Sequence, residues 1–264
     1  MKIELEQTSV HIATGGRAHR DDAAFVVFLH GSGQSHLTWA LQSRYFAYEG
    51  YNIIAPDFPG HGLSGGAPLS SIEALTDWLA RLLAEMGVKT AAFVGHSQGC
   101  LVALDMASRH AACVERLCLI AGAAAIPVNG WLVDASASKI DAAIEMMTGW
   151  GHGKVAHFHD NTQPGFNHLG FGRALMSAND KTALHADLQA CNAYEKGAFA
   201  AASVTQPCHL ILAAGDKMTP LKQGRKLALM IPHSTVTEIV GAGHMLPSEN
   251  PDEVNVPLAR FLAL

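Results

Sequence analysis

The chain has 264 residues, of which 49% are hydrophobic and 16% charged, so it can bury a sizeable core without disulfide or metal support. Its formal net charge of −5 argues against the basic surface that nucleic-acid-binding proteins usually carry. The five cysteines are odd in number and include no C-x-x-C pair, which favours buried, reduced thiols over a disulfide framework or a zinc site.

The opening residues, "MKIELEQTSV", alternate between polar and apolar types and lack the apolar centre of a signal peptide. A cytoplasmic location is therefore expected. No uncharged apolar stretch approaches the length of a membrane-spanning helix, so no membrane span is predicted. Residues 1–14 are expected to form an antiparallel pair of strands.

Short apolar segments that suit buried strands follow along the chain. They occupy residues 24–30, 51–57, 91–97, 116–122, 208–216 and 234–240. Helical patterns separate them, as at 71–86, where Ser71 can cap the first turn and Gly87 can end the helix. The other helical patterns cover residues 98–109, 221–231 and 251 to the C-terminus. This alternation predicts an α/β fold with a mostly parallel, eight-stranded sheet and helices on both faces.

The alternation is interrupted between residues 126 and 195, where no buried strand is predicted. Helical patterns at 135–148 and 180–195 flank a loop rich in His, Gly and aromatic residues at 149–172. A connection of this length is not an ordinary loop. We expect residues 126–195 to form a helical cap over one end of the sheet, while residues 1–125 and 196–264 form the core domain.

The segment "GHSQGC" at residues 95–100 contains a G-x-S-x-G pattern between a predicted strand and a predicted helix. In that context the turn lifts Ser97 to the carboxyl edge of the sheet, where ligands bind in open α/β folds. Gly95 and Gly99 are expected because a side chain at either position would strike the neighbouring strand or helix. The helix that follows presents its positive N-terminal end to the serine.

A serine hydroxyl needs a base to become a good nucleophile, and the base needs an acid to orient it. Asp216 follows the predicted strand at 208–214, and His244 follows the strand at 234–240. Both loops open at the same sheet edge as Ser97, so the three side chains can meet. Asp134 remains an alternative acid.

The segment "FLHGSGQSHLTW" at residues 28–39 follows the first buried strand and can supply a backbone N–H to an oxyanion hole. Ser32 is the predicted donor, with Gly33 as the alternative, and Gln98 is the predicted second donor. His96 is expected to pack beside the elbow, and His61 is expected to hold its own loop by hydrogen bonds.

The motifs "HGSG", "PDFPGHGLS", "GHSQG", "GDKMTP" and "GAGHMLPSENP" follow one another over residues 28–251. In this order the chain resembles the α/β-hydrolase fold superfamily, and especially its capped subgroup. That subgroup includes carboxylesterases of small esters and C–C bond hydrolases of aromatic ring-cleavage products. The resemblance implies a catalytic triad of Ser97, Asp216 and His244 that needs no metal and no organic cofactor.

The leading hypothesis is a serine hydrolase that cleaves a small, fairly apolar ester through an acyl-enzyme, acting as a monomer or homodimer on a small-molecule acyl substrate. The residues expected to contact substrate are His36, Trp39, Phe58, Trp131, Met146, Met218 and Met245. A C–C bond hydrolase is the first alternative, and its carboxylate-bearing substrate could be anchored by Arg173, Lys139 or Arg109. A non-catalytic, hydrolase-like receptor for a small ligand is the second.

Overall fold

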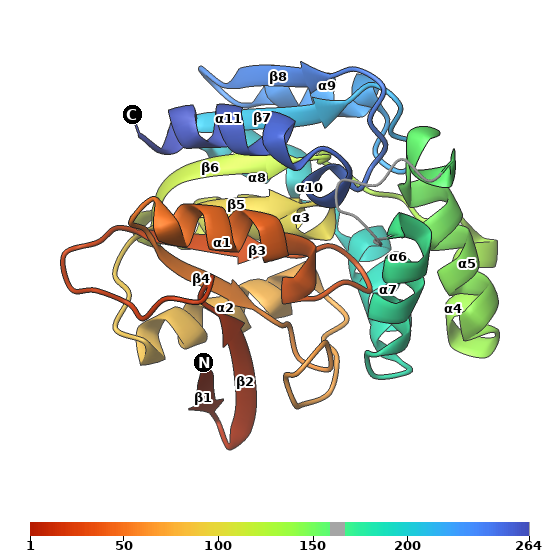
Figure 1. The fold of residues 1–264 in the computed structure, drawn as a ribbon, viewed down its shortest axis with the longest axis horizontal. Helices are drawn as coiled ribbons and strands as arrows, with labels where there is room; N and C mark the ends of the chain where they lie inside the picture. Colours follow the sequence, from red (N-terminus) through yellow and green to blue (C-terminus); the bar gives the residue numbers. More distant parts are fainter. Residues whose placement is uncertain (159–166, 264) are drawn as a thin grey trace.

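The computed structural model of the chain describes residues 1–158 and 167–263. Its eight strands form one sheet in the order β1-β2-β4-β3-β5-β6-β7-β8, shown in Figure 1. The strands are β1 (Lys2–Leu5), β2 (Thr8–Ala13), β3 (Phe25–Leu29), β4 (Asn52–Pro56), β5 (Ala91–His96), β6 (Val114–Ile120), β7 (Cys208–Ala213) and β8 (Thr235–Ile239). Only the β1–β2 and β2–β4 pairs are antiparallel. The predicted fold class is therefore confirmed.

The central strands are apolar on both faces because each face is covered by helices. Along β3, Val27 and Leu29 belong to one apolar cluster, whereas Val26 and Phe28 belong to the cluster on the opposite face. All four side chains are fully buried. Burying each such side chain contributes roughly 1.5–3 kcal/mol, so two covered faces explain the continuous apolar run.

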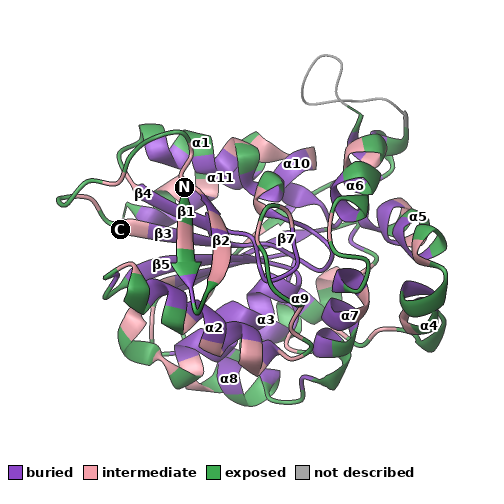
Figure 2. Cartoon of the chain, turned by 90° about the horizontal axis from the view of Figure 1, so that it is seen from below, coloured by how far each residue is buried: buried purple, intermediate pink, exposed green. Residues whose placement is uncertain are grey.

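The helices divide between the two faces of the sheet, and Figure 2 shows buried residues concentrated on the strands and on the inner sides of these helices. One face is covered by α1 (Ala40–Tyr48) and α11 (Pro251–Leu262). The other is covered by α2 (Ile72–Glu85), α3 (Gln98–Arg109), α8 (Gly197–Ser203) and α9 (Leu221–Met230). Ser71 caps α2 as predicted, since its hydroxyl accepts from the Ala74 N–H at 3.1 Å. Helices α1 and α8 were not among the predicted elements.

Five α-helices are described between β6 and β7, and all of them except α8 lie beyond the sheet edge where the parallel strands end (Figure 1). Those four are α4 (Gly130–Ser138), α5 (Ile140–Gly151), α6 (His168–Ser177) and α7 (Ala183–Ala193). We call these four helices and the segments between them the helical insertion. They share an apolar cluster of their own, formed by Leu132, Ala135, Ala143, Ile144, Met147, Met176, Leu184 and Leu188. No strand occurs among the described residues of this segment.

Two details of the insertion differ from the sequence prediction. The helix expected at 135–148 is divided into α4 and α5 at Lys139, whose φ of −142° is not helical. The loop expected at 149–172 ends earlier, because the Asn167 side chain accepts from the Gly170 N–H at 2.7 Å and starts α6. Residues 159–166 of that predicted loop lie outside the described residues.

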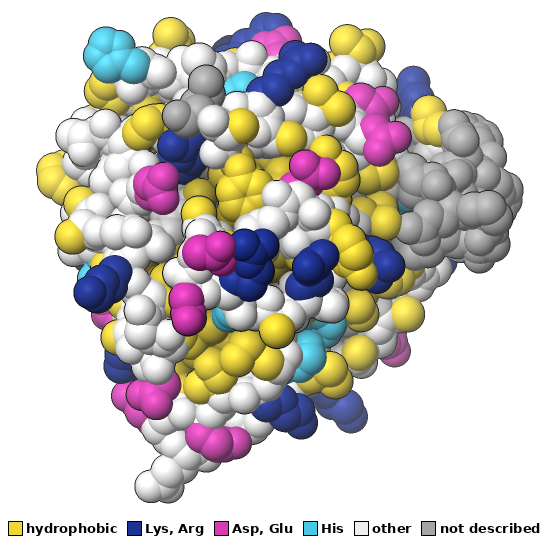
Figure 3. All heavy atoms as spheres, turned by 60° about the vertical axis from the view of Figure 1, so that its left-hand side comes forward, with side chains coloured by type: hydrophobic (Ala, Val, Ile, Leu, Met, Phe, Trp, Pro, Cys, Tyr) yellow, Lys and Arg dark blue, Asp and Glu magenta, His cyan; other side chains and the backbone are white. Residues whose placement is uncertain are grey.

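Among the residues that the structure describes, no helix is both long enough and apolar enough to span a membrane. On the face shown in Figure 3, Lys and Arg side chains lie among Asp and Glu side chains, with hydrophobic side chains between them. This face therefore carries no broad area of one charge.

The close approach of Gly99 to the backbone of β3 yields a stability prediction. A Cβ atom added at Gly99 would overlap the carbonyl group of Leu29, and backbone cannot move aside as a side chain can. We expect Gly99→Ala to destabilise the fold by about 1–3 kcal/mol or more, although Ala normally favours a helix. Urea unfolding would measure this.

Gly149→Ala is the matched control, because Gly149 lies within α5 and no atom stands within 4 Å of an added Cβ. At this position only the higher helix propensity of Ala should matter, so Gly149→Ala should stabilise the fold by about 0.5–1 kcal/mol. Equal effects at the two positions would contradict the steric explanation.

Candidate active site

Ser97 lies in a strained turn between β5 and α3. Its φ of 54° and ψ of −118° are rarely adopted by residues other than glycine, and such a conformation costs roughly 1–3 kcal/mol. The register places Gly95 of β5 between Leu29 of β3 and Leu119 of β6, so the turn stands at the middle of the sheet edge. Strain of this kind persists where surrounding packing holds it, and it marks functional sites.

Asp216 and His244 come together at the same edge. His244 Nδ1 lies 2.7 Å from Asp216 Oδ2, and both side chains are buried. Since an ionised carboxylate only accepts hydrogen bonds, Nδ1 is the donor and Nε2 is left as the acceptor nitrogen of a neutral ring. The loops after β7 and β8 therefore bring the predicted acid and base into contact.

Thr219 holds the Asp216 carboxylate beside His244, whose Nδ1 lies 3.2 Å from the Thr219 hydroxyl. The backbone N–H groups of Met218 and Thr219 donate to Asp216 Oδ1 at 2.8 Å each, and the Thr219 hydroxyl lies 2.7 Å from Oδ2. Burial by itself raises the pKa of Asp216, but His244 and these hydrogen bonds outweigh it, so the pKa lies below its ordinary value. Asp216 is thus ionised at neutral pH. Sequence analysis missed Thr219, although a threonine three residues after an Asp in a turn is a recognisable signal.

Ser97 and His244 both line one cavity of about 200 Å³ between the sheet edge and the helical insertion. Its apolar walls include Ile126, Val128, Met147, Trp150, Met176 and Leu188. Among the described residues that line it, Lys217 is the only lysine or arginine. A small, mainly apolar compound with one polar or anionic group fits such a lining.

Two of the predicted substrate-contacting residues, Met218 and Met245, line this cavity. The other five lie elsewhere, as follows. Trp39 is fully buried against Phe28, Phe58 is fully buried against His30, and His36 donates to Asp57. Trp131 is 50% exposed, and Met146 packs on the apolar cluster of the insertion. The prediction placed Trp39 and Phe58 in the cavity, but their large apolar area favours burial beneath the loops after β3 and β4.

The predicted oxyanion-hole donors lie beside Ser97. Ser32 lines the cavity, and Gln98 is the first residue of α3, where a helical N–H lacks an intrahelical partner. Gly33, the alternative donor, is already engaged, because its N–H donates to Asp187 Oδ2 at 2.7 Å. This contact favours Ser32 over Gly33.

His96 supports His244 through the backbone. Its Nε2 donates to the carbonyl oxygen of His244 at 2.9 Å, and the two ring centroids are 4.8 Å apart. Burial, assisted by His244, lowers the pKa of His96 to about 3, so the ring is neutral at physiological pH. Asp134, the alternative acid, is exposed on α4, whereas Asp216 contacts His244 directly.

The three cations considered as substrate anchors do not line the cavity. Arg109 pairs with Asp77 and Asp105, and Arg173 pairs with Glu145. Lys139 separates α4 from α5. Of the lysines and arginines in the described part of the chain, only Lys217 lines the cavity, and sequence analysis did not single it out.

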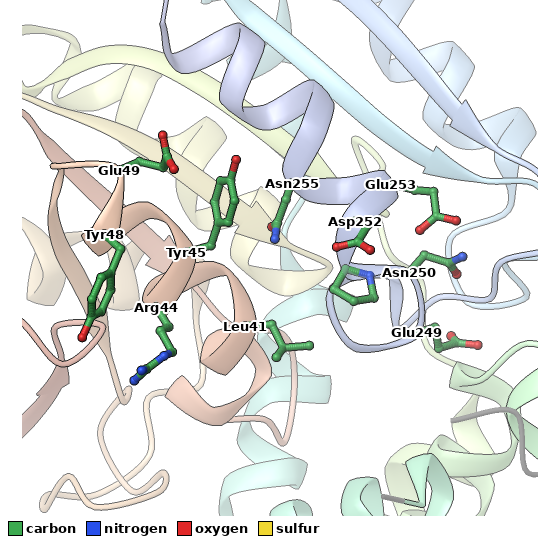
Figure 4. A pocket seen from close by; sticks show the side chains of 11 residues that line it. Leu41, Arg44, Tyr45, Tyr48, Glu49, Glu249, Asn250, Asp252, Glu253 and Asn255 are labelled. Carbon is green, nitrogen blue, oxygen red and sulfur yellow. The ribbon is translucent and has the colours of Figure 1, made fainter. Parts of the chain in front are cut away.

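Other clusters lie outside this cavity. His11, His36 and Asp57 bring three potential metal ligands within 4.8 Å, but Asp57 there accepts hydrogen bonds from His36 and from the Leu63 N–H. A more open hollow of about 680 Å³ lies between α1 and α11, and Figure 4 shows Arg44 and Tyr48 on its α1 side and Asp252 and Asn255 on its α11 side. Neither Ser97 nor His244 lines it.

Glu249 joins the helical insertion to the loop that carries His244. Its carboxylate accepts from the Gly153 N–H at 2.7 Å and from the Met245 N–H at 3.2 Å. Burial raises the pKa of Glu249 to about 7, in spite of these two hydrogen bonds to the ionised form. The group therefore titrates in the physiological range.

The raised pKa of Glu249 predicts a pH-dependent stability. Between about pH 4.5 and pH 7 the unfolded chain loses this proton while the folded chain keeps it, so the free energy of unfolding falls as pH rises. In Glu249→Gln this fall should be smaller, by up to about 1.4 kcal/mol per pH unit. Urea unfolding at several pH values measures it. Glu253→Gln, exposed on α11, is the control and should keep the wild-type slope. A wild-type slope in Glu249→Gln would contradict the assignment.

The chain is similar to known proteins of one family. Residues 26–256 match the Alpha/beta hydrolase family. Among curated proteins, the chain is similar to the pimeloyl-[acyl-carrier protein] methyl ester esterase of Aromatoleum aromaticum. The two are 29% identical over 248 residues, which cover 88% of this chain and 95% of that protein.

Solved structures show the same fold at lower sequence identity. The enol-lactonase of Burkholderia xenovorans superposes with a TM-score of 0.90 and 23% identity, covering 100% of both chains. A thermophilic esterase of Thermogutta terrifontis superposes with a TM-score of 0.85 and 20% identity, covering 100% of this chain and 97% of that one. Because the family match spans the parallel strands, the serine turn and the loops of Asp216 and His244, the chain belongs to the alpha/beta hydrolase family, with esterase-like relatives.

Proposed function

We propose that the chain is a serine hydrolase that cleaves a small, fairly apolar carboxylic ester through an acyl-enzyme. The observation that carries this proposal is the 2.7 Å contact between Asp216 and His244, at the cavity that Ser97 lines from a strained turn. The names of two relatives support it, since one is a methyl ester esterase and the other an enol-lactonase, which acts on a cyclic ester.

In the proposed reaction, His244 Nε2 takes the proton of Ser97 Oγ while Oγ attacks the carbonyl carbon of the ester. Asp216 keeps the ring in the required tautomer and stabilises the imidazolium that forms. The N–H groups of Ser32 and Gln98 stabilise the oxyanion, and one such donor is typically worth about 3–4 kcal/mol.

Collapse of the tetrahedral intermediate breaks the bond to the alcohol oxygen, which receives the proton from His244. The acid part of the substrate is now an ester of Ser97. Water then gives a proton to His244 as it attacks this ester. The second tetrahedral intermediate collapses by breaking the bond between the carbonyl carbon and Ser97 Oγ, which takes the proton back from His244, and the acid is released.

Lys217 favours a second candidate within the same chemistry. A C–C bond hydrolase acts on a substrate that carries a carboxylate, and Lys217 stands in the cavity lining where such a group could bind. The same three residues would act. We place this second, because the curated relative from Aromatoleum aromaticum is an ester hydrolase by name.

Removing the hydroxyl of Ser97 tests the nucleophile. We expect Ser97→Ala to lower turnover of p-nitrophenyl acetate by at least about 10³-fold and to abolish labelling by a fluorophosphonate. Ser177→Ala is the matched control, because Ser177 is exposed on α6, and it should keep wild-type activity. Near-normal turnover in Ser97→Ala would contradict the proposal.

The size of the cavity predicts the preferred acyl chain. A space of about 200 Å³ holds a short acyl group, while the apolar walls favour a few methylenes over none. Across p-nitrophenyl esters of rising chain length, kcat/KM should peak at short chains and drop for long ones. A steady rise up to decanoate would show that the cavity does not limit the substrate.

A further inference from the structure

One residue of the helical insertion, Asp187 on α7, reaches into the loop after β3 that carries Ser32. Its side chain is fully buried, and its Oδ2 accepts from the Gly33 N–H at 2.7 Å. From the turn before α7, the Asn179 side chain donates to the Gly33 carbonyl oxygen at 2.7 Å. The insertion thus binds Gly33 through both its N–H and its C=O, next to Ser32.

The same carboxylate also contacts the elbow and a third loop. Gln98 Nε2 donates to Asp187 Oδ1 at 3.2 Å, and His61 Nε2 lies 2.9 Å from Oδ2. One turn further along α7, Cys191 Sγ lies 3.5 Å from the Ser32 hydroxyl. Asp187 therefore joins the segment of Ser32, the start of α3 and the loop after β4.

The hydrogen bonds of His61 determine its charge. Nδ1 lies 3.0 Å from the carbonyl oxygen of Pro59, and Nε2 faces the Asp187 carboxylate. Both partners are acceptors, so both ring nitrogens must donate, and a ring that donates from both nitrogens is an imidazolium. Nearby His30 differs, because its Nε2 accepts from the Phe58 N–H and the ring is neutral.

The electrostatic surroundings agree with this assignment. Burial by itself lowers the pKa of His61, but Asp187 outweighs it, so the pKa lies above its ordinary value. Two further carboxylates, Asp57 in the loop after β4 and Asp180 before α7, also interact favourably with a charged His61. The ring of His30 lies 5.1 Å from that of His61 between centroids, but burial lowers the pKa of His30 to about 4 and keeps it neutral.

We propose that Asp187 and the imidazolium of His61 are a positioning pair through which the helical insertion sets the oxyanion hole. This rests on the proposed function, since the hole is that of Ser32 and Gln98. A displacement of about 1 Å in such a group can cost about 10²-fold in rate. As pH rises through the folded pKa of His61, the ring loses one of its two bonds, and the stability that the pair contributes, fully present below about pH 6.5, is lost.

Asp187→Asn is the first test. The amide cannot replace a carboxylate that accepts from three donors, so we expect kcat to fall by about 10- to 100-fold while KM changes by less than about threefold. Asp141→Asn, exposed in the first turn of α5, is the matched control and should keep wild-type kinetics. A change in thermal stability or KM alone, with kcat retained, would overturn the proposal.

His61→Gln supplies a readout that a purely structural role would not change. Wild-type kcat should decline on the alkaline side as His61 loses its proton, and this decline should be absent in His61→Gln, whose amide does not titrate. The same alkaline limb in both proteins would overturn the pairing. This comparison decides the matter if Asp187→Asn does not fold.

A measurement on the wild-type protein separates this proposal from the proposed function. Nitrogen-15 NMR at about pH 7 should show His61 protonated on both ring nitrogens and His30 protonated on one. A neutral His61 would overturn the pair whether or not the protein is an esterase. Conversely, a doubly protonated His61 in a protein that neither turns over esters nor labels at Ser97 would leave the buried pair intact but refute its link to an oxyanion hole.

Discussion

The close approach of the turn at Ser97 to the end of β3 is the constraint on which the rest of the structure depends. Gly99 stands against the carbonyl of Leu29, and Gly95 stands against the backbone of Gly99. Only hydrogen fits at these two positions, and the turn between them forces Ser97 to a positive φ. The loop after β3 is thereby brought against the start of α3, so that Ser32 and Gln98 can serve one site.

Three buried histidines near the site have different pKa shifts, although burial by itself lowers the pKa of each. His30 and His96 each have a backbone partner that suits a neutral ring, and burial lowers their pKa to about 4 and about 3. His61 faces two acceptors, one of them the Asp187 carboxylate, and its pKa is raised instead. Where a buried histidine has no counterion, the cost of burying a charge keeps its ring neutral. A buried carboxylate beside the ring outweighs that cost and keeps the ring protonated.

The helical insertion has two kinds of contact with the rest of the chain. Glu249 joins Gly153 to the His244 loop, and Asp187 with Asn179 binds the loop of Ser32. Both sides of the cavity are therefore held by hydrogen bonds from residues remote from Ser97 in the sequence. The walls of the cavity are apolar, so these polar contacts determine the position of the insertion on the sheet edge. The side chains of Met147, Met176 and Leu188 determine the size of the cavity.

The sequence by itself determined the sheet, its mainly parallel order and the position of Ser97, because the continuous apolar runs of the strands and the glycines of the turn are local signals. It also predicted that Asp216 and His244 follow strands that end at one edge. Tertiary structure decided the rest of the cavity lining, since Trp39 and Phe58 are buried beneath their loops while Lys217 lines the cavity. It alone paired Asp187 with His61, residues on separate elements with no shared sequence pattern. Such contacts depend on how the insertion packs on the sheet edge, and that packing has no local periodicity from which to predict it.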